Sequence, residues 1–277
     1  MQDAFAYCTE LVRTADRDRY IATLFAPAQH RDPLFALYAF AVDIARVREL
    51  AHEALPGEIR LQWWSEVLER ERSGEAAGNP VAGALLGTME RYRLPAEKLL
   101  DLIEAHRFDL YDEPMATIAE LETYMTKTSS VLIGLAAQIL GTNADAAAEP
   151  AGIAYGLTAL MRAFPVHAAR GQLYLPAELL ERHGVHAHDI FAGRSSNGLK
   201  AVFAELRSLA RHQLALASER LRAVPSAAIP AFLSVALVRP SLDLLERGDP
   251  FTPPEISPWR RQWLIWCAAR NPARVAR

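Results

Sequence analysis

The amino-acid sequence predicts an all-α protein. Apolar residues recur at helical spacing along nearly the whole chain, as in the run from Pro33 to Leu50. Alternating β-branched runs are scarce, and the turn pair Asn197-Gly198 lies in a serine-rich loop instead of joining two such runs. No linker or repeat divides the sequence, so we expect a single helical domain over residues 1–277.

Eight principal helices are expected, and prolines or glycines mark several of their ends. In chain order they are Pro33 to Leu50, Ile59 to Glu71, Pro95 to Leu110, Thr117 to Leu140, Ala144 to Phe164, Leu199 to Val224, Pro225 to Leu245 and Pro258 to Arg270. Pro33 suits a first turn, because the N–H that proline lacks has no partner inside the helix there. Gly141 and Pro165 are expected to end the helices that precede them.

Composition excludes several classes of protein. A net charge of −3 gives no indication of nucleic-acid binding. Cys8 and Cys267 form no CxxC pair, so neither a zinc site nor a disulfide framework is expected. The N-terminus does not resemble a signal peptide, and we expect no transmembrane helix. These features predict a cytoplasmic protein, for which a peripheral contact with the inner membrane stays open.

Four segments in order resemble signatures of the squalene/phytoene synthase family. They are Leu37-Tyr38-Ala39-Phe40, Leu61-Gln62-Trp63-Trp64, the stretch from Leu121 to Gly134 with Tyr124 and Ser129, and Gly171-Gln172-Leu173-Tyr174-Leu175-Pro176. Each segment alone is weak, but their order and spacing cover nearly the whole chain. The resemblance implies the all-helical isoprenoid (trans-prenyl) synthase fold in a single domain.

The resemblance also implies where catalytic acids should lie. In that family, pairs of carboxylates four residues apart hold magnesium ions that bind and activate a diphosphate. Carried over to this sequence, the first pair falls at Ala45 and Glu49 and the second at Ala163 and His167. Only Glu49 is an acid, and Asp43 lies about 240° around the helix from it. We therefore expect no catalytic residue, no bound metal and no cofactor, with magnesium needed only if the protein is an active transferase.

A narrower resemblance joins this sequence to the non-catalytic mitochondrial branch of the family that assists the assembly of respiratory complex I. The segments that carry it are the run from Leu37 to Val47, the run from Thr158 to Pro165, Leu175-Pro176 and Arg239-Pro240-Ser241-Leu242. The resemblance implies an assembly or chaperone-like role near the inner membrane, with complex I subunits or assembly factors as protein partners. Without an import peptide, a bacterial relative of that branch is expected.

Eight residues are expected to line the vestigial pocket of such a pseudoenzyme. They are Tyr38, Asp43, Arg46, Glu49, Ser129, Arg162, His167 and Tyr174. Two interpretations of Arg46 stay open: it grips a phosphate or anionic head group, or it forms an ion pair with Glu49 or another acid.

Three functions stay open for the whole chain. The first is the non-enzymatic assembly factor, and the second is a prenyltransferase acting on farnesyl or geranylgeranyl diphosphate. The third is a metal-independent binder of isoprenoids or lipids. Near the C-terminus, Trp259, Trp263 and Trp266 share a helical spacing beside arginines. We expect them to pack on the domain, with a weak contact to anionic lipid as the alternative.

Overall fold

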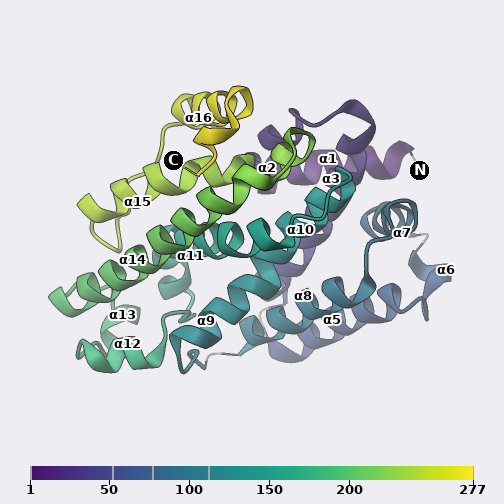
Figure 1. Ribbon diagram of the computed structural model, residues 1–277. Coiled ribbons are helices and arrows are strands. Elements are labelled where there is room, and N and C mark those ends of the chain that lie inside the picture. Colours follow the sequence, from purple (N-terminus) through teal and green to yellow (C-terminus); the bar gives the residue numbers. More distant parts are fainter. Residues whose placement is uncertain (1, 52, 77, 112, 277) are drawn as a thin grey trace. The chain divides into compact units, whose positions relative to one another are not determined.

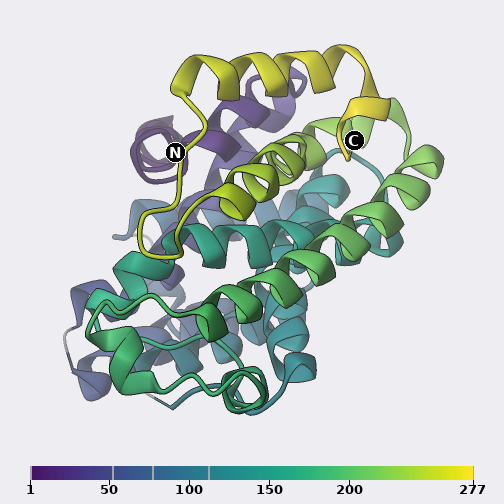
Figure 2. The ribbon, with the colours of Figure 1, turned by 90° about the vertical axis from the view of Figure 1, so that its left-hand side faces the viewer.

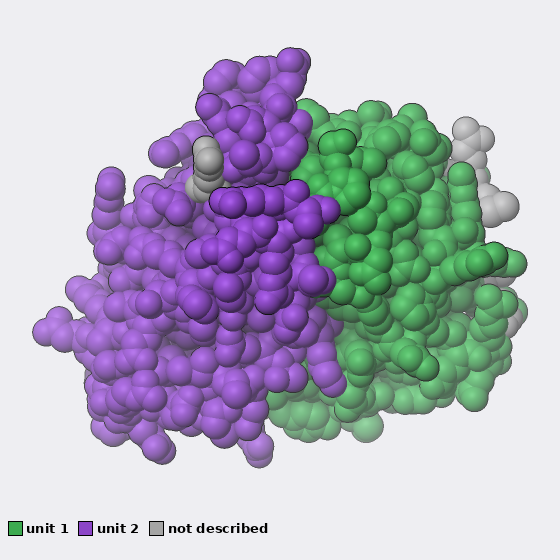
Figure 3. Space-filling view, viewed as in Figure 1, with its two compact units in different colours: residues 1–111, 131–145, 224–233 green, residues 112–130, 146–223, 234–277 purple. Residues whose placement is uncertain are grey.

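The computed structural model describes residues 2–51, 53–76, 78–111 and 113–276, and it confirms the all-α prediction (Figure 1). Within these residues there is no β-strand, and the extended pairing is a single bridge between Asp249 and Thr252. The chain divides into two compact units, coloured separately in Figure 3: residues 1–111, 131–145 and 224–233 form unit 1, and residues 112–130, 146–223 and 234–277 form unit 2. The single domain over residues 1–277 stays a prediction.

Unit 1 contains the N-terminal helices. They are α1 (Gln2–Ala15), α2 (Arg17–Thr23), α3 (Ala28–Ala45), α4 (Val47–Leu50), α5 (Ala54–Leu68), α6 (Ser73–Ala76), α7 (Pro80–Tyr92), α8 (Ala96–Arg107), the 3₁₀ turn η1 (Phe108–Leu110) and α10 (Val131–Ile139). Helix α3 packs against α1, α7 and α10 and is buried along most of its length. The ring of Phe40 on α3 meets Trp64 on α5 edge-on, with centroids 5.0 Å apart.

Unit 2 contains the later helices. They are α9 (Ile118–Met125), the π-turn η2 (Thr126–Ser130), α11 (Asp145–Ala169), α12 (Ala177–Arg182), α13 (Ala187–Phe191), α14 (Asn197–Arg220), η3 (Leu221–Ala223), α15 (Val238–Arg247), α16 (Pro258–Arg270) and η5 (Pro272–Arg274). The 3₁₀ segment η4 (Ser226–Leu237) runs from unit 1 into unit 2. Phe164 on α11 packs edge-on against Phe203 on α14 at 5.0 Å between centroids, and the two long helices run through the unit in Figure 2.

Pro33 does not begin a helix, contrary to the sequence prediction. It lies inside α3, which starts at Ala28. Proline has no N–H, so the carbonyl of Gln29, four residues earlier, loses its helical donor. The hydroxyl of Tyr92 on α7 donates to this carbonyl at 3.3 Å, which replaces the missing bond.

Pro165 does not end a helix either. Helix α11 continues to Ala169 and also contains Pro150. Pro150 leaves the carbonyl of Ala146 without a helical donor, and Nη1 of Arg220 on α14 donates to it at 2.7 Å. The predicted end at Phe164 was therefore wrong by five residues.

The helix expected from Thr117 to Leu140 is present but contains an irregular turn. Between α9 and α10 the residues Thr126–Ser130 form a π-turn. In such a turn each hydrogen bond spans five residues, which admits one extra residue and shifts the helix face. The small residues at this place allow close packing, because a Cβ on Gly152 of α11 would collide with the backbone of Ser130.

One segment passes a length and composition test for crossing a membrane within the described residues. It is Ser226–Arg247, which has 22 residues and contains an 18-residue window with a mean hydropathy of 1.5. Its most apolar window is 78 % buried, as in a core helix. Most of this segment is therefore buried inside the protein in this structure.

Candidate functional site

Four of the eight predicted pocket residues lie in unit 1 and four lie in unit 2, so each group is described by itself. In unit 1, Tyr38 is buried in the core, and the guanidinium of Arg19 lies over its ring at 5.4 Å. Burial raises the pKa of Tyr38 to about 12. Arg19 is itself bound to Asp16 at 2.8 Å, so Tyr38 belongs to an internal cluster.

The other three residues of unit 1 lie where α3 ends. Helix α3 ends at Ala45, and Arg46 is its C-cap. Nε of Arg46 is 3.6 Å from Oε2 of Glu49, with both side chains about half-exposed. The ion pair between Arg46 and Glu49, one of the two interpretations of this arginine, is therefore present.

Asp43, two residues before the end of α3, is partly buried. Its burial raises the pKa of the carboxyl group, and the positive charges of Arg60 and Arg46 oppose that rise. Five residues after Asp43, Arg48 reaches η1, where its Nη1 donates to the carbonyl of Leu110 at 3.0 Å. Two arginines at the C-terminal end of α3 also suit the negative end of the helix dipole.

In unit 2 a tight turn brings His167 and Tyr174 together. Gly171 adopts a left-handed conformation (φ 73°), and the N–H of Gln172 donates back to the carbonyl of His167 at 2.9 Å. The chain then returns along α11, so that the rings of His167 and Tyr174 lie 4.7 Å apart. Tyr124 on α9 adds a third ring, 6.1 Å from Tyr174.

Directly after the Gly171–Pro176 motif, the first two residues of α12 hold the chain at the start of α9. The N–H groups of Ala177 and Glu178 donate to the carbonyls of Met115 and Ala116 at 2.8 and 3.1 Å. The Glu178 carboxylate in turn accepts from the N–H of Ile118 at 2.6 Å. The start of α12 is therefore fixed to the start of α9, which carries Tyr124, and Tyr174 of the motif contacts both Tyr124 and His167.

Ser129 and Arg162 complete the predicted set in unit 2. Ser129 lies on the π-turn beside α11, since a Cβ on Gly156 would come within 2.7 Å of its Oγ. Arg162 is half-buried on α11, five residues before His167 and about 140° away around the helix. Ser129 thus contacts α11 closely, whereas Arg162 and His167 leave that helix in different directions.

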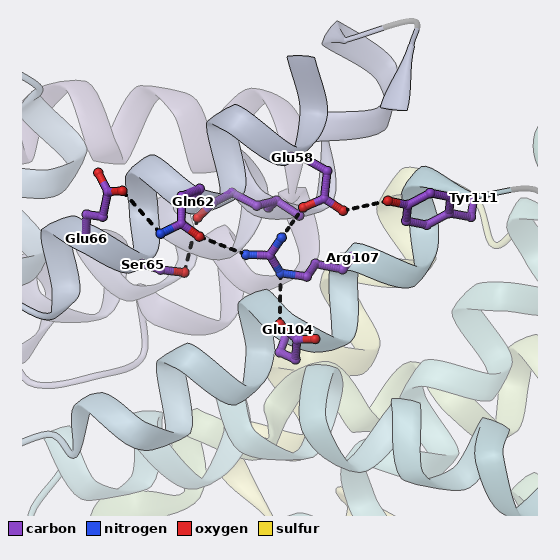
Figure 4. Close-up of polar contacts among 8 residues, drawn as sticks. Glu58, Gln62, Ser65, Glu66, Glu104, Arg107 and Tyr111 are labelled. Carbon is purple, nitrogen blue, oxygen red and sulfur yellow. Dashed lines mark hydrogen bonds and ion pairs between the residues drawn. The ribbon is translucent and has the colours of Figure 1, made fainter. Parts of the chain in front are cut away.

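A polar cluster in unit 1 was missed by the sequence analysis. Arg107 on α8 lies at its centre and forms ion pairs with Glu58 on α5 and, at 2.8 Å, with Glu104 (Figure 4). Its Nη2 donates to Oε1 of Gln62 at 3.2 Å, and the hydroxyl of Tyr111 donates to Glu58 at 3.0 Å. Three of the polar positions, 58, 62 and 66, repeat every four residues, which is the signal that could have found them.

The Arg107 cluster lines a groove with a volume of about 400 Å³. Its apolar wall is made by Ile59 and Trp63, and Arg72 and Glu66 form an ion pair at one end. The charged side chains that line the groove form ion pairs with one another, and the pair between Arg107 and Glu58 joins α8 to α5. Within the described residues of either unit, no group of three or more His, Cys, Asp or Glu side chains could hold a metal ion.

Comparison with known proteins defines the class of this chain. Residues 12–266 match the family squalene/phytoene synthase, and the chain belongs to that family. It is 32 % identical over 250 residues to the rat protein named NADH dehydrogenase (ubiquinone) complex I, assembly factor 6, covering 89 % of this chain and 75 % of that one. The human protein of the same name is 32 % identical over 246 residues, or 88 % and 74 % of the two chains.

Enzymes of the family are also similar to this chain. A 15-cis-phytoene synthase of Synechococcus elongatus is 27 % identical over 266 residues, covering 90 % of this chain and 86 % of the enzyme. A dehydrosqualene synthase crystal structure aligns with a TM-score of 0.83 at 20 % identity, over 97 % and 96 % of the chains. Squalene synthase HpnC of Alicyclobacillus acidocaldarius aligns at 0.78 and 25 % identity, over 91 % and 95 %. These structures confirm the predicted isoprenoid synthase fold.

Proposed function

We propose that this chain is a non-catalytic member of its family that assists the assembly of respiratory complex I at the inner membrane. The observation that carries the proposal is the 32 % identity to complex I assembly factors over nearly nine-tenths of the chain. Identity to the phytoene synthase is lower, at 27 %. The partners would be complex I subunits or other assembly factors, and the protein would act from the cytoplasmic side of a bacterial membrane.

The residues at the expected acid positions support this proposal. Ala45, Ala163 and His167 occupy three of the four positions where the family resemblance places carboxylates. Magnesium prefers several oxygen ligands, so a lone carboxylate and an imidazole are a poor donor set for it. The remaining acid, Glu49, forms an ion pair with Arg46.

The contacts of the predicted pocket residues fit a vestigial site occupied by its own side chains. In unit 1 Tyr38 is buried under Arg19, and in unit 2 His167 contacts Tyr174. Such internal contacts are what a residue with a structural role would make. Among the predicted pocket residues, Arg162 would suit a retained contact with an anion, and Asp43 would suit one with a cation.

A prenyltransferase acting on farnesyl or geranylgeranyl diphosphate is the second candidate. It is supported by the likeness to phytoene synthase over 90 % of the chain. This candidate requires magnesium and carboxylates other than the expected pairs. A metal-independent isoprenoid or lipid binder is a related alternative that would need only an apolar cavity.

Deletion of the gene in its own organism separates these functions. The assembly role predicts loss of assembled complex I on native gels and loss of NADH:quinone oxidoreductase activity in membranes, both restored by the wild-type gene. Arg13→Ala, which alters only an exposed pair with Glu10, should restore both as well. Normal complex I together with loss of isoprenoid products would contradict the proposal and favour the transferase.

A further inference from the structure

The three tryptophans of α16 are exposed, and this contradicts the expectation that they pack on the domain. The exposed fractions are 83 % for Trp259, 60 % for Trp263 and 39 % for Trp266. Tryptophan is a large, mostly apolar side chain, so three exposed copies on one short helix are costly in water. We call this set the tryptophan face; α16 lies at the edge of unit 2 in Figures 1 and 2.

The tryptophan face is one straight stripe. Positions 259, 263 and 266 follow the spacing i, i+4, i+7, and Arg270 continues the stripe by another turn. The buried residues of α16, Ile265 and Ala268, lie about 200° around the helix from Trp263 and Trp266. The helix therefore binds its own unit with one side and presents the tryptophans on the opposite side.

The stripe is also ordered by contacts among its own side chains. The rings of Trp263 and Trp266 are stacked, with centroids 5.0 Å apart and planes 20° apart. The guanidinium of Arg270 lies over the Trp266 ring at 4.8 Å. These contacts hold the rings in place before any partner binds, which lowers the entropy cost of binding.

Positive charge predominates in the sequence around the tryptophan face. Residues 251–277 contain five arginines and a single acid, Glu255, in a chain with a net charge of −3. The helix itself carries Arg260, Arg261 and Arg270 and has no acidic residue. Positive charge is therefore concentrated at the end of a chain that is acidic overall, and it would attract a negatively charged surface.

We propose that the tryptophan face docks the protein on anionic phospholipid membrane, with α16 lying in the plane of the interface. Indole rings favour the boundary between lipid head groups and acyl chains, where the apolar ring is buried and the N–H stays near water. Arg260 and Arg270 lie where they contact lipid phosphates, and 13 residues give a helix about 20 Å long that matches a flat surface. This inference rests on α16 alone and does not depend on the proposed function.

Flotation of the purified protein with vesicles tests the proposal. The probes are vesicles of phosphatidylcholine alone and of phosphatidylcholine with phosphatidylglycerol. The wild type should float with the anionic vesicles, and raising the salt concentration should release it. Trp259→Ala/Trp263→Ala should abolish flotation, and Arg260→Gln/Arg270→Gln should weaken binding by about twentyfold, because each arginine near the surface contributes roughly a factor of five.

Matched variants and a depth measurement accompany this test. Leu55→Ala/Ile59→Ala removes two other exposed apolar side chains, 70 % and 64 % exposed, and should float like the wild type. Arg222→Gln/Arg239→Gln removes two exposed arginines outside α16 and should also float. Brominated lipid should quench tryptophan fluorescence of the wild type and not that of Trp259→Ala/Trp263→Ala, whose fold is checked by circular dichroism.

Several outcomes would overturn the proposal. They are no flotation of the wild type, equal flotation with neutral vesicles, and flotation that the tryptophan substitutions leave unchanged. A fourth is self-association, in which light scattering shows a wild-type dimer that Trp259→Ala/Trp263→Ala converts to a monomer. That result would assign the tryptophan face to a second copy of the chain.

Discussion

Asp43 is a carboxyl group in surroundings that favour its neutral form. Burial raises its pKa, and Arg60 and Arg46 compensate only in part. The pKa of this group in the folded protein is therefore above the value of about 3.9 of an unfolded chain. The ionised carboxylate of Asp43 is less stable in the folded protein than in the unfolded chain. The free energy of unfolding therefore falls as the pH rises from the unfolded pKa through the folded pKa of this group.

Replacement of this residue should raise stability at neutral pH. Asp43→Asn should increase the free energy of unfolding at pH 7, because it removes a partly buried charge. The difference from the wild type should shrink as the pH falls and level off well below about 3.9, where the carboxyl group is protonated in both states. Urea titrations of the two proteins at a series of pH values measure this difference.

Asp249 provides the opposite control for that experiment. Hydrogen bonds from the Ser195 hydroxyl and the Phe251 N–H hold the pKa of Asp249 below its usual value. Asp249→Asn should therefore lower stability at pH 7, an effect that fades at acid pH. A stability gain for Asp249→Asn, or a loss for Asp43→Asn at pH 7, would contradict the assignment of these two environments.

Single residues show which site contacts the sequence could predict. The Arg46–Glu49 pair was expected as one of two interpretations, because the charges of a cavity without metal need compensation. His167 and Tyr174 were expected to line the same pocket, but their ring contact was not predicted, because it depends on the left-handed turn at Gly171. Sequence spacing predicts contacts within a helix but not those made by a chain reversal.

At the scale of elements, α11 packs against the π-turn through glycine. A Cβ on Gly152 would collide with the Ser130 backbone, which cannot move aside as a flexible side chain could. Gly152→Ala should therefore lower the free energy of unfolding by about 3 kcal/mol, as overpacking does. Gly87→Ala, in α7 with open space around it, should instead raise stability by about 0.5 kcal/mol. Equal effects of the two substitutions in urea denaturation would contradict this packing.

The contact between α5 and α8 depends on Arg107. Arg107→Ala removes its bonds to Glu58, Gln62 and Glu104 and leaves the partly buried Glu58 without this cation. We expect a loss of about 2 kcal/mol in the free energy of unfolding, typical of hydrogen bonds to charged groups. Arg13→Ala breaks an exposed pair and should leave the denaturation midpoint unchanged. If Arg107→Ala leaves the denaturation midpoint unchanged, as Arg13→Ala should, the contacts of Arg107 contribute little to the stability of the fold.

The positions of helices followed from periodicity, whereas their ends did not. Helix α16 has the bounds expected from the sequence, Pro258–Arg270. Pro33 and Pro165 were taken as helix ends, but both lie inside helices. For Pro33 the compensating donor is Tyr92, which is distant in sequence. The π-turn at Thr126–Ser130 likewise reflects packing against α11 that local propensity does not encode.

For the whole molecule, the proposed loss of catalysis predicts how diphosphates bind. Calorimetric titration with a farnesyl thio-diphosphate analogue should show an affinity that magnesium changes by less than about threefold, given one carboxylate at four expected positions. The phytoene synthase of Synechococcus elongatus serves as a positive control. Tight binding that requires magnesium would contradict the proposal, and binding without magnesium that Arg46→Gln or Arg162→Gln abolishes would indicate an anion contact by these arginines.

The prolines inside α3 and α11 have a consequence for how the protein folds. Pro33 and Pro150 each remove one backbone hydrogen bond from their helix. The donor that replaces it lies 63 residues away in sequence for the Gln29 carbonyl and 74 residues away for the Ala146 carbonyl. In an isolated segment water would be the donor to these two carbonyls, and the protein donor replaces it only when the distant part of the chain packs against the helix. Such non-local dependence slows folding and makes it cooperative, so helix formation and tertiary assembly become one event within each unit.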